Sequence, residues 1–343
     1  AIRPRAPLEP TPGAANTTLI AVKANASQVG LVGFGEDLKL EAHNVALEIN
    51  TSSGNPTLAP IVNFAESFPA NGSTPVGMPI RTGTTTDPIY IDFDGDERIA
   101  ISTDAAILQV SEFLHVSGSF AFVKGPKITA VVSTNVGTIQ EAHLESMTIG
   151  ARNVSAFVGI GGPYRNDDNH DLIWDSSESI NEDAKGFVID DLNFGLTLLN
   201  RAPLELDPRL ANTTFIGLKA TANTVGFVGF GDDFKLELHN IQVDINTSNS
   251  SIGAIVDFAA SFPADVATNT PVGMPVRTST TGDPIYLDFD GKNRIAASTD
   301  AAILQISEFV HVSGAFAFSK GPTVLADVDT PLGTTHDVAM ETM

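Results

Sequence analysis

A block of 36 residues occurs twice in this chain, and this duplication limits the possible folds more than any other feature. Residues 87–122 read DPIYIDFDGDERIAISTDAAILQVSEFLHVSGSFAF, and residues 283–318 read DPIYLDFDGKNRIAASTDAAILQISEFVHVSGAFAF. The two blocks are identical at 29 of 36 positions and begin 196 residues apart. Near-identity at a fixed offset predicts that one structural unit is built twice.

The same offset relates segments on both sides of the block. RAPLE at residues 5–9 returns at 201–205, and VGLVGFGEDLKLEAHNVALEIN at 29–50 returns as VGFVGFGDDFKLELHNIQVDIN at 225–246. Residue 343 corresponds to residue 147. We therefore expect a full repeat over residues 1–196 and a second, truncated repeat over residues 197–343, cut from a longer array.

Smaller units recur inside the full repeat. NVSAFVGIGG at 153–162 parallels NTVGFVGFGD at 223–232, and FVIDDLNFGLTLL at 187–199 parallels FKLELHNIQVDI at 234–245. Each repeat is therefore expected to consist of strand–loop–strand units, and units of this kind stack side by side to bury a continuous core.

Apolar residues alternate with polar ones along these units. Leu38 and Leu40 are followed by Val45, Leu47 and Ile49, with a break at the His-Asn pair 43–44. A period of two indicates a β-strand with one buried face, and the break indicates a bend. The phase slips again at 111–113, where we expect a bulge or a corner, and Gly118 indicates a second bend or a close approach of two backbones.

These patterns predict an all-β fold in an elongated tandem-repeat array. The repeats are arranged either as a β-solenoid or as stacked sandwich-like units, and the recurrence of small units slightly favours the solenoid. The 29 Gly and 20 Pro residues, set against only 19 Lys and Arg, suit strands and turns rather than long helices.

Charge and cysteine content exclude several classes of function. The formal net charge is −22, which excludes a nucleic-acid-binding protein. The chain has no cysteine, so disulfides, thiol nucleophiles and thiolate-bound zinc are absent. No run of 18 apolar residues occurs, so we expect no membrane span. Strong acidity suits a cation-rich medium, and we expect an extracellular or cell-surface location.

One acidic loop has the spacing of a calcium site. Residues 167–178 read DDNHDLIWDSSE, with oxygen-bearing side chains at positions 1, 3, 5, 9 and 12. This loop resembles the calcium loop of EF-hands and of dockerin-type repeats, although Leu172 stands where those loops have glycine. The alternative is a solvated acidic loop. The resemblance implies Ca²⁺ held by Asp167, Asn169, Asp171, the carbonyl oxygen of Ile173, Asp175 and Glu178.

The DFDGD string at 92–96 also suggests calcium, but its second copy argues against a shared site. There the string becomes DFDGK, and Lys292 replaces Asp96 with a group that only donates hydrogen bonds. We expect a β-turn with Gly95 and Gly291 at positive φ.

No catalytic arrangement stands out. The seven histidines form no metal-binding pattern, and pairs of carboxylates are expected by chance in so acidic a chain. We therefore predict that the chain has no catalytic residues and is not an enzyme. A polysaccharide-acting enzyme remains the third hypothesis, because glycosidases use two facing carboxylates.

Three phrases carry a wider resemblance. TIGARNVSAFVGIGG at 148–162, VIDDLNFGLTLL at 188–199 and FLHVSGSFAFVKG at 113–125 resemble repeat units of very large bacterial cell-surface or secreted adhesin-like proteins. The resemblance implies a structural segment of an extracellular fibre, sheath or surface stalk, stiffened by calcium and self-associating into a filament or array. The alternative is an adhesin, a carbohydrate-binding module that holds surface glycans.

Overall fold

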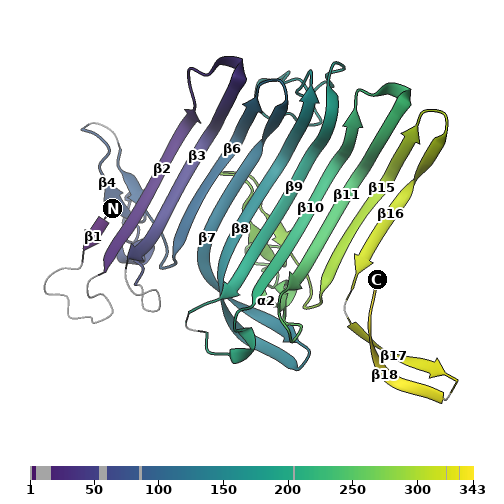
Figure 1. The fold of residues 1–343 in the computed structure, drawn as a ribbon. Coiled ribbons are helices and arrows are strands. Elements are labelled where there is room, and N and C mark those ends of the chain that lie inside the picture. The colour runs from purple at the N-terminus through teal and green to yellow at the C-terminus, as the bar shows by residue number, and fades with distance from the viewer. Residues whose placement is uncertain are drawn as a thin grey trace.

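The computed structural model describes residues 2–4, 17–53, 60–84, 87–203, 205–321, 323–331 and 333–343. Twelve strands in this part of the chain form one large antiparallel sheet, which runs across Figure 1 from β2 to β16. The prediction of an all-β fold is confirmed.

The path of the sheet follows the chain closely. The order β1-β2-β3-β6-β7-β8-β9-β10-β11-β15-β16 skips only the short strands between them, and β12 pairs with β7. The bounds are β1 Ile2–Pro4, β2 Thr18–Gly30, β3 Leu38–Ser53, β6 Arg98–Val110, β7 Leu114–Thr134, β8 Gly137–Ile160, β9 Lys185–Arg201, β10 Thr214–Val228, β11 Phe234–Ser248, β12 Ile255–Asp257, β15 Arg294–Ile306 and β16 Val310–Lys320.

The remaining elements are short. Three two-stranded hairpins are β4 Met78–Ile80 with β5 Ile89–Ile91, β13 Met274–Val276 with β14 Ile285–Leu287, and β17 Thr323–Thr330 with β18 Gly333–Glu341. Two single-turn helices are α1 Phe64–Ser67 and α2 Phe258–Ser261, and three 3₁₀ turns are Gly35–Asp37, Pro208–Leu210 and Gly231–Asp233. No helix in the described ranges has the length and apolar character needed to cross a membrane.

The described strands form no solenoid coil. Neighbouring long strands are joined by reversals of the chain, so every pairing recorded between them is antiparallel. The expected phase slip at 111–113 is such a reversal rather than a bulge, because β6 ends at Val110, Ser111 has a φ of 48°, and β7 begins at Leu114. Ser307 makes the same turn in the second copy with a φ of 45°.

The predicted bends are single left-handed residues inside continuous strands. Asn44 in β3, Asn153 in β8, Asp191 in β9 and Asn240 in β11 have φ values between 50° and 54°. Asparagine and aspartate tolerate this conformation better than other side chains. The close approach of two backbones expected at Gly118 is confirmed, since a Cβ atom there would lie 3.0 Å from Val154 Cα and 3.2 Å from the carbonyl oxygen of Arg152.

Each copy carries a small module that packs on the sheet. The first cover module (60–84 and 87–93) contains α1, β4 and β5, and the second cover module (254–289) contains α2 and β12 to β14. A buried asparagine holds each one. Asn50 Nδ2 donates to the carbonyl oxygens of Val62, Asp94 and Asp96, and Asn246 Nδ2 donates to those of Val256, Asp290 and Lys292.

The DFDG sequences, residues 92–95 and 288–291, lie at the C-terminal ends of the two cover modules. Asp92 is 2.8 Å from Lys23 Nζ and Asp288 is 2.6 Å from Lys219 Nζ, so the first aspartate of each string forms an ion pair with a sheet lysine. The positive φ expected for Gly95 and Gly291 is wrong. In both copies the string is held by the carbonyl contacts to the buried asparagine, and a left-handed glycine is not part of that arrangement.

The main hydrophobic core lies between the two copies. The ends of β7 and β8 extend below the rest of the sheet beside α2 (Figure 1), and β12 pairs with β7 from Ile255 opposite Ser133 to Asp257 opposite Val131. The fifteen buried residues of this core are Ala130, Val132, Ile139, Ala142, Leu144, Leu199, Leu210, Phe215, Ala254, Val256, Phe258, Met274, Val276, Leu287 and Phe289. Among the described residues, the first cover module packs on a cluster of five, Ala21, Phe64, Met78, Ile91 and Phe93.

Two equivalent phenylalanines test this difference. Phe258→Ala should lower the free energy of unfolding by about 3–5 kcal/mol, because it leaves a cavity in a closed core. Phe64→Ala, at the matching position of the smaller cluster, should lower it by less, because fewer buried neighbours lose contacts. Urea denaturation of both variants measures the two losses. Equal losses, or a larger loss for Phe64→Ala, would show that the shared core is not the main source of stability.

Candidate metal centre

The acidic loop joins two long strands of the sheet. It leaves β8 at Ile160 and enters β9 at Lys185. Its base is closed by an isolated bridge between Arg165 and Ile180. Asn181 Nδ2 also donates to the carbonyl oxygens of Gly161 and Pro163. The loop is therefore closed at its neck by contacts between its own two ends.

A buried ion pair fixes the acidic end of the loop to the sheet. Arg165 Nε and Nη2 donate to the carboxylate oxygens of Asp190 at 2.8 and 2.6 Å, and Asp190 is 1% exposed in β9. The remaining guanidinium nitrogen, Nη1, donates to the carbonyl oxygen of Glu178 at 2.8 Å. One side chain thus links a sheet carboxylate to the last residue of the predicted calcium loop.

The only tryptophan in the sequence provides a second anchor. Trp174 is buried, and its backbone N–H donates to Ser117 Oγ of β7 at 3.0 Å. Its ring lies 5.9 Å from that of His115, which in turn lies 6.1 Å from Phe157. Burial lowers the pKa of His115, so this ring stays neutral near pH 7. The histidine is a core residue rather than a free base.

Three of the predicted ligands come together. One carboxylate oxygen from each of Asp167, Asp171 and Glu178 lies within 4.8 Å of the other two. Glu178 is 5% exposed, and neither of its oxygens accepts a well-formed hydrogen bond in the described part of the chain, although the backbone N–H of Asn169 approaches the carboxylate and opposes the rise in its pKa. Asp167 Oδ1 is buried in the same way. Buried carboxylates without partners are costly, so this arrangement suits a bound cation.

The electrostatics of the cluster agree with that geometry. Burial raises the pKa of Glu178 above its usual value of 4.5, and the charges of Asp167, Asp171 and Asp175 raise it further. A divalent cation would remove both causes, because it replaces the lost hydration and offsets the neighbouring charge.

The other predicted ligands take part in local hydrogen bonds. Asn169 Oδ1 accepts from the backbone N–H of Asp171 at 2.9 Å, and Asp175 Oδ1 accepts from the N–H of Ser177 at 2.8 Å. The N–H of Ile173 donates to Asp171 Oδ1 at 2.8 Å, which fixes this residue within the loop. These bonds shape the loop around the three clustered carboxylates.

The residue that departs from the calcium-loop pattern adopts an unusual conformation. Leu172 stands at the glycine position and has a φ of 69°, and His170 has a φ of 62°. A left-handed conformation costs a residue with a side chain roughly 1–2 kcal/mol. The loop therefore makes its sharp turn without glycine, held by Trp174 and by the side-chain bonds on either side.

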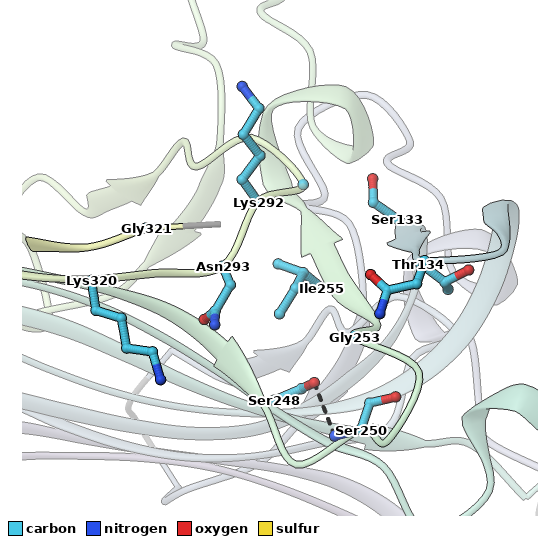
Figure 2. Close-up of a pocket in the computed structure, with 12 residues that line it drawn as sticks. Ser133, Thr134, Ser248, Ser250, Gly253, Ile255, Lys292, Asn293, Lys320 and Gly321 are labelled. Carbon is cyan, nitrogen blue, oxygen red and sulfur yellow. Dashed lines mark hydrogen bonds between the residues drawn. The ribbon is translucent and has the colours of Figure 1, made fainter. Parts of the chain in front are cut away.

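A separate hollow opens at the seam between the two copies (Figure 2). It encloses about 250 Å³ and its lining comes from the end of β7, the loop before β12 and the segments around residues 291–293 and 320–321. Lys292 in its wall forms an ion pair of 2.8 Å with Asp290. The lining residues are Ser133, Thr134, Asn135, Ser248, Ser250, Gly253, Ile255, Gly291, Lys292, Asn293, Lys320 and Gly321.

Sequence reasoning located the acidic loop but missed its anchors. Arg165 and Asp190 lie 25 residues apart, and Ser117 and Trp174 lie 57 residues apart. A lone tryptophan inside an acidic loop was the available signal, because a large apolar ring in such a segment needs a buried partner.

Comparison of the chain with models of protein families, with curated proteins and with solved structures gave no match. Its function is therefore inferred from its own geometry.

The raised pKa of Glu178 gives a pH-dependent prediction for the metal-free protein. The folded state holds this proton more tightly than the unfolded chain, whose glutamate has the ordinary pKa of 4.5. The contribution to stability is therefore present below pH 4.5 and is lost as pH rises through the raised pKa. Glu178→Gln removes the buried charge, so it should raise the Tm in chelator at pH 7 and change it little at pH 4.

Glu182→Gln is the matched control, because Glu182 is an exposed carboxylate in the same loop. It should leave the Tm nearly unchanged at both pH values. A Glu178→Gln variant that lowers the Tm at pH 7 would contradict the view that this carboxylate is strained without a cation.

Proposed function

We propose that the chain is a structural repeat segment of an extracellular fibre, sheath or surface stalk, in which successive repeats stack into an elongated array stiffened by Ca²⁺. The observation that carries this proposal is the shared core: the second cover module is buried against strands of the first copy, through β12 on β7 and through the fifteen-residue cluster.

The shared core explains why the unit is repeated. A cover module that packs on its neighbour's strands gains apolar burial that it lacks alone, and apolar burial is the main favourable term in folding. The first copy illustrates the alternative, because the described part of its module packs on five buried residues, all from its own copy. Nearest-neighbour contacts of this kind are what hold stacked repeats together.

Calcium fits the acidic loop by its chemistry. Ca²⁺ prefers carboxylate and carbonyl oxygens, and Asp167, Asp171 and Glu178 offer three carboxylates at one point, with buried oxygens that lack partners. The predicted ligand set adds Asn169, the carbonyl of Ile173 and Asp175. Since Arg165 and Trp174 tie the loop to β9 and β7, a cation there would brace three strands of the sheet.

Calcium binding can be measured directly by titration calorimetry of the purified chain. We expect one site in the wild-type chain, loss of binding in Glu178→Gln, and binding at wild-type strength in the control Glu182→Gln. The affinity should fall on acidification, because the ligands must be deprotonated to bind the metal. Equal binding by all three proteins would place calcium elsewhere and remove it from this loop.

Electron microscopy of the wild-type chain in calcium, and again after chelation, tests the fibre itself. Periodic filaments that loosen on chelation are the expected result. Filaments that stay intact after chelation would support the fibre but would show that calcium does not stiffen it. Separate compact particles under both conditions would contradict the structural role and would favour a glycan-binding module.

A further inference from the structure

A loop of the second cover module lies on the sheet of the first copy. Residues 277–283 connect β13 and β14, and they reach strands β3 and β6. The backbone N–H groups of Thr280 and Thr281 both donate to Asp104 Oδ1, at 2.9 and 3.1 Å. A single carboxylate of the first copy therefore holds the tip of a loop from the second.

Further contacts hold the same tip. Thr280 Oγ1 donates to the carbonyl oxygen of Asn44 at 2.9 Å and lies 3.0 Å from Ser102 Oγ. Arg277 Nη1 lies 3.3 Å from Glu48 Oε2. The guanidinium also donates to carbonyl oxygens of its own loop, at Ser279 and Thr280, so it shapes the loop and pairs it with the sheet. The contact is polar, charged and specific in position.

The residues that receive this loop recur in the second copy. Their counterparts, 196 residues later, are Asn240, Asp244, Ser298 and Asp300, which we name the acceptor groove. Asn240, Ser298 and Asp300 line a hollow of about 380 Å³. Ser102 is 2% exposed beneath the seated loop, whereas Ser298 is exposed.

One acidic group in the acceptor groove lacks a partner that its counterpart has. Glu48 lies 3.3 Å from Arg277 and 3.7 Å from Arg98, whereas Asp244 lies 4.0 Å from Arg294, the counterpart of Arg98, and its Oδ1 is buried without a hydrogen bond in the described part of the chain. Its other oxygen accepts from Gln242 Nε2 at 3.0 Å. A buried carboxylate oxygen without a partner is costly, so this position suits an incoming arginine.

The matching loop is present in the first copy. Residues 81–84 read RTGT, against RTST at 277–280, and we name them the donor loop. All four are exposed, whereas Thr278 is 0% and Ser279 is 6% exposed in the seated loop. Arg81 is thus a free surface cation, of the kind that the acceptor groove pairs with.

A second surface that corresponds to part of this contact is also exposed. The β17–β18 hairpin corresponds to the ends of β7 and β8, which bury Ala130, Val132 and Leu144 under the second cover module. In the hairpin Met340, the counterpart of Leu144, is 46% exposed, whereas Leu144 is 0% exposed. Figure 1 shows this hairpin projecting from the C-terminal end of the sheet. The apolar and polar halves of the contact are therefore both available at the same end.

We propose that the acceptor groove binds the donor loop of a second copy of this chain, so that copies join head to tail through the contact already made between the two repeats. The inference rests on the proposed function and supplies its contact surfaces. A head-to-tail contact between two different faces generates an open filament when the rotation between successive copies does not close a ring.

The absence of cysteine allows a direct cross-linking test. The variant Ser102→Cys with Thr280→Cys is the internal standard: these side-chain oxygens lie 3.0 Å apart, so it should form a disulfide within one chain. The variant Thr84→Cys with Ser298→Cys places the pair at the corresponding donor and acceptor positions. On mild oxidation it should form a ladder of disulfide-linked chains, and Thr84→Cys mixed with Ser298→Cys should stop at linked pairs.

Charge reversal provides a second measurement on the full chain. Arg81→Glu should weaken self-association, measured by sedimentation, about tenfold or more, because it places two like charges together. Adding Asp244→Arg to the same chain should restore much of the loss, since the pair is then reversed. Glu182→Gln should behave as the wild type.

The results of these experiments distinguish the proposed contact between donor loop and acceptor groove from the proposed fibre itself. Filaments that form while the Thr84/Ser298 pair stays unlinked, and that tolerate Arg81→Glu, would overturn the contact and keep the fibre. A chain that stays monomeric throughout, with the internal standard correctly linked, would overturn both. A ladder together with the charge-reversal rescue establishes the contact.

Discussion

The burial of one copy's cover module against the strands of its neighbour is the interaction on which this structure depends. The second module places Val256, Phe258 and Leu287 beneath β7, β8 and β10, and all three are fully buried. Asn246 draws three carbonyl oxygens onto one side chain and so closes the module over this core. The first module has the same asparagine and a similar sequence, and the described residues of its core all belong to its own copy. The core of the second module differs in that it also includes residues of β7 and β8 from the first copy.

The strands and their buried faces followed from the sequence, but their order did not. Alternation in β3 and the repeat of the 36-residue block indicated long strands with one buried face, and these are local properties. The change in apolar periodicity at Ser111 did not reveal the strand order, because a β-bulge and a tight hairpin turn both interrupt the period of two. Pairing of β12 with β7, and the bond from Thr280 to Asp104 across 176 residues, depend on tertiary packing. Hydrophobic periodicity is a local property and cannot predict contacts between residues so far apart in the sequence.

The acidic loop shows the same division. Spacing of oxygen-bearing side chains located it, and three of its carboxylates do meet. The buried environment of Glu178, however, is made by Arg165, Asp190 and Trp174, which position the loop against the sheet. A cation site at this point and a docking groove at the end of the sheet would act together, since one stiffens the unit and the other extends the array. The acidity of the chain suits both roles, because Asp244 and Glu178 each keep a buried oxygen without a hydrogen-bond partner among the described residues.

Hydrogen–deuterium exchange of the equivalent segments of the two copies tests the dependence on a neighbour most directly. The segment 255–261 and the seated loop 278–280 should exchange slowly, because β12 pairs with β7 and the loop tip is bound by Asp104. The corresponding segments 61–67 and 82–84 should exchange much faster in dilute protein, because the described contacts of the first module lie within its own copy. Equal protection of the matched segments would contradict the account, because it would show that each repeat completes its own fold.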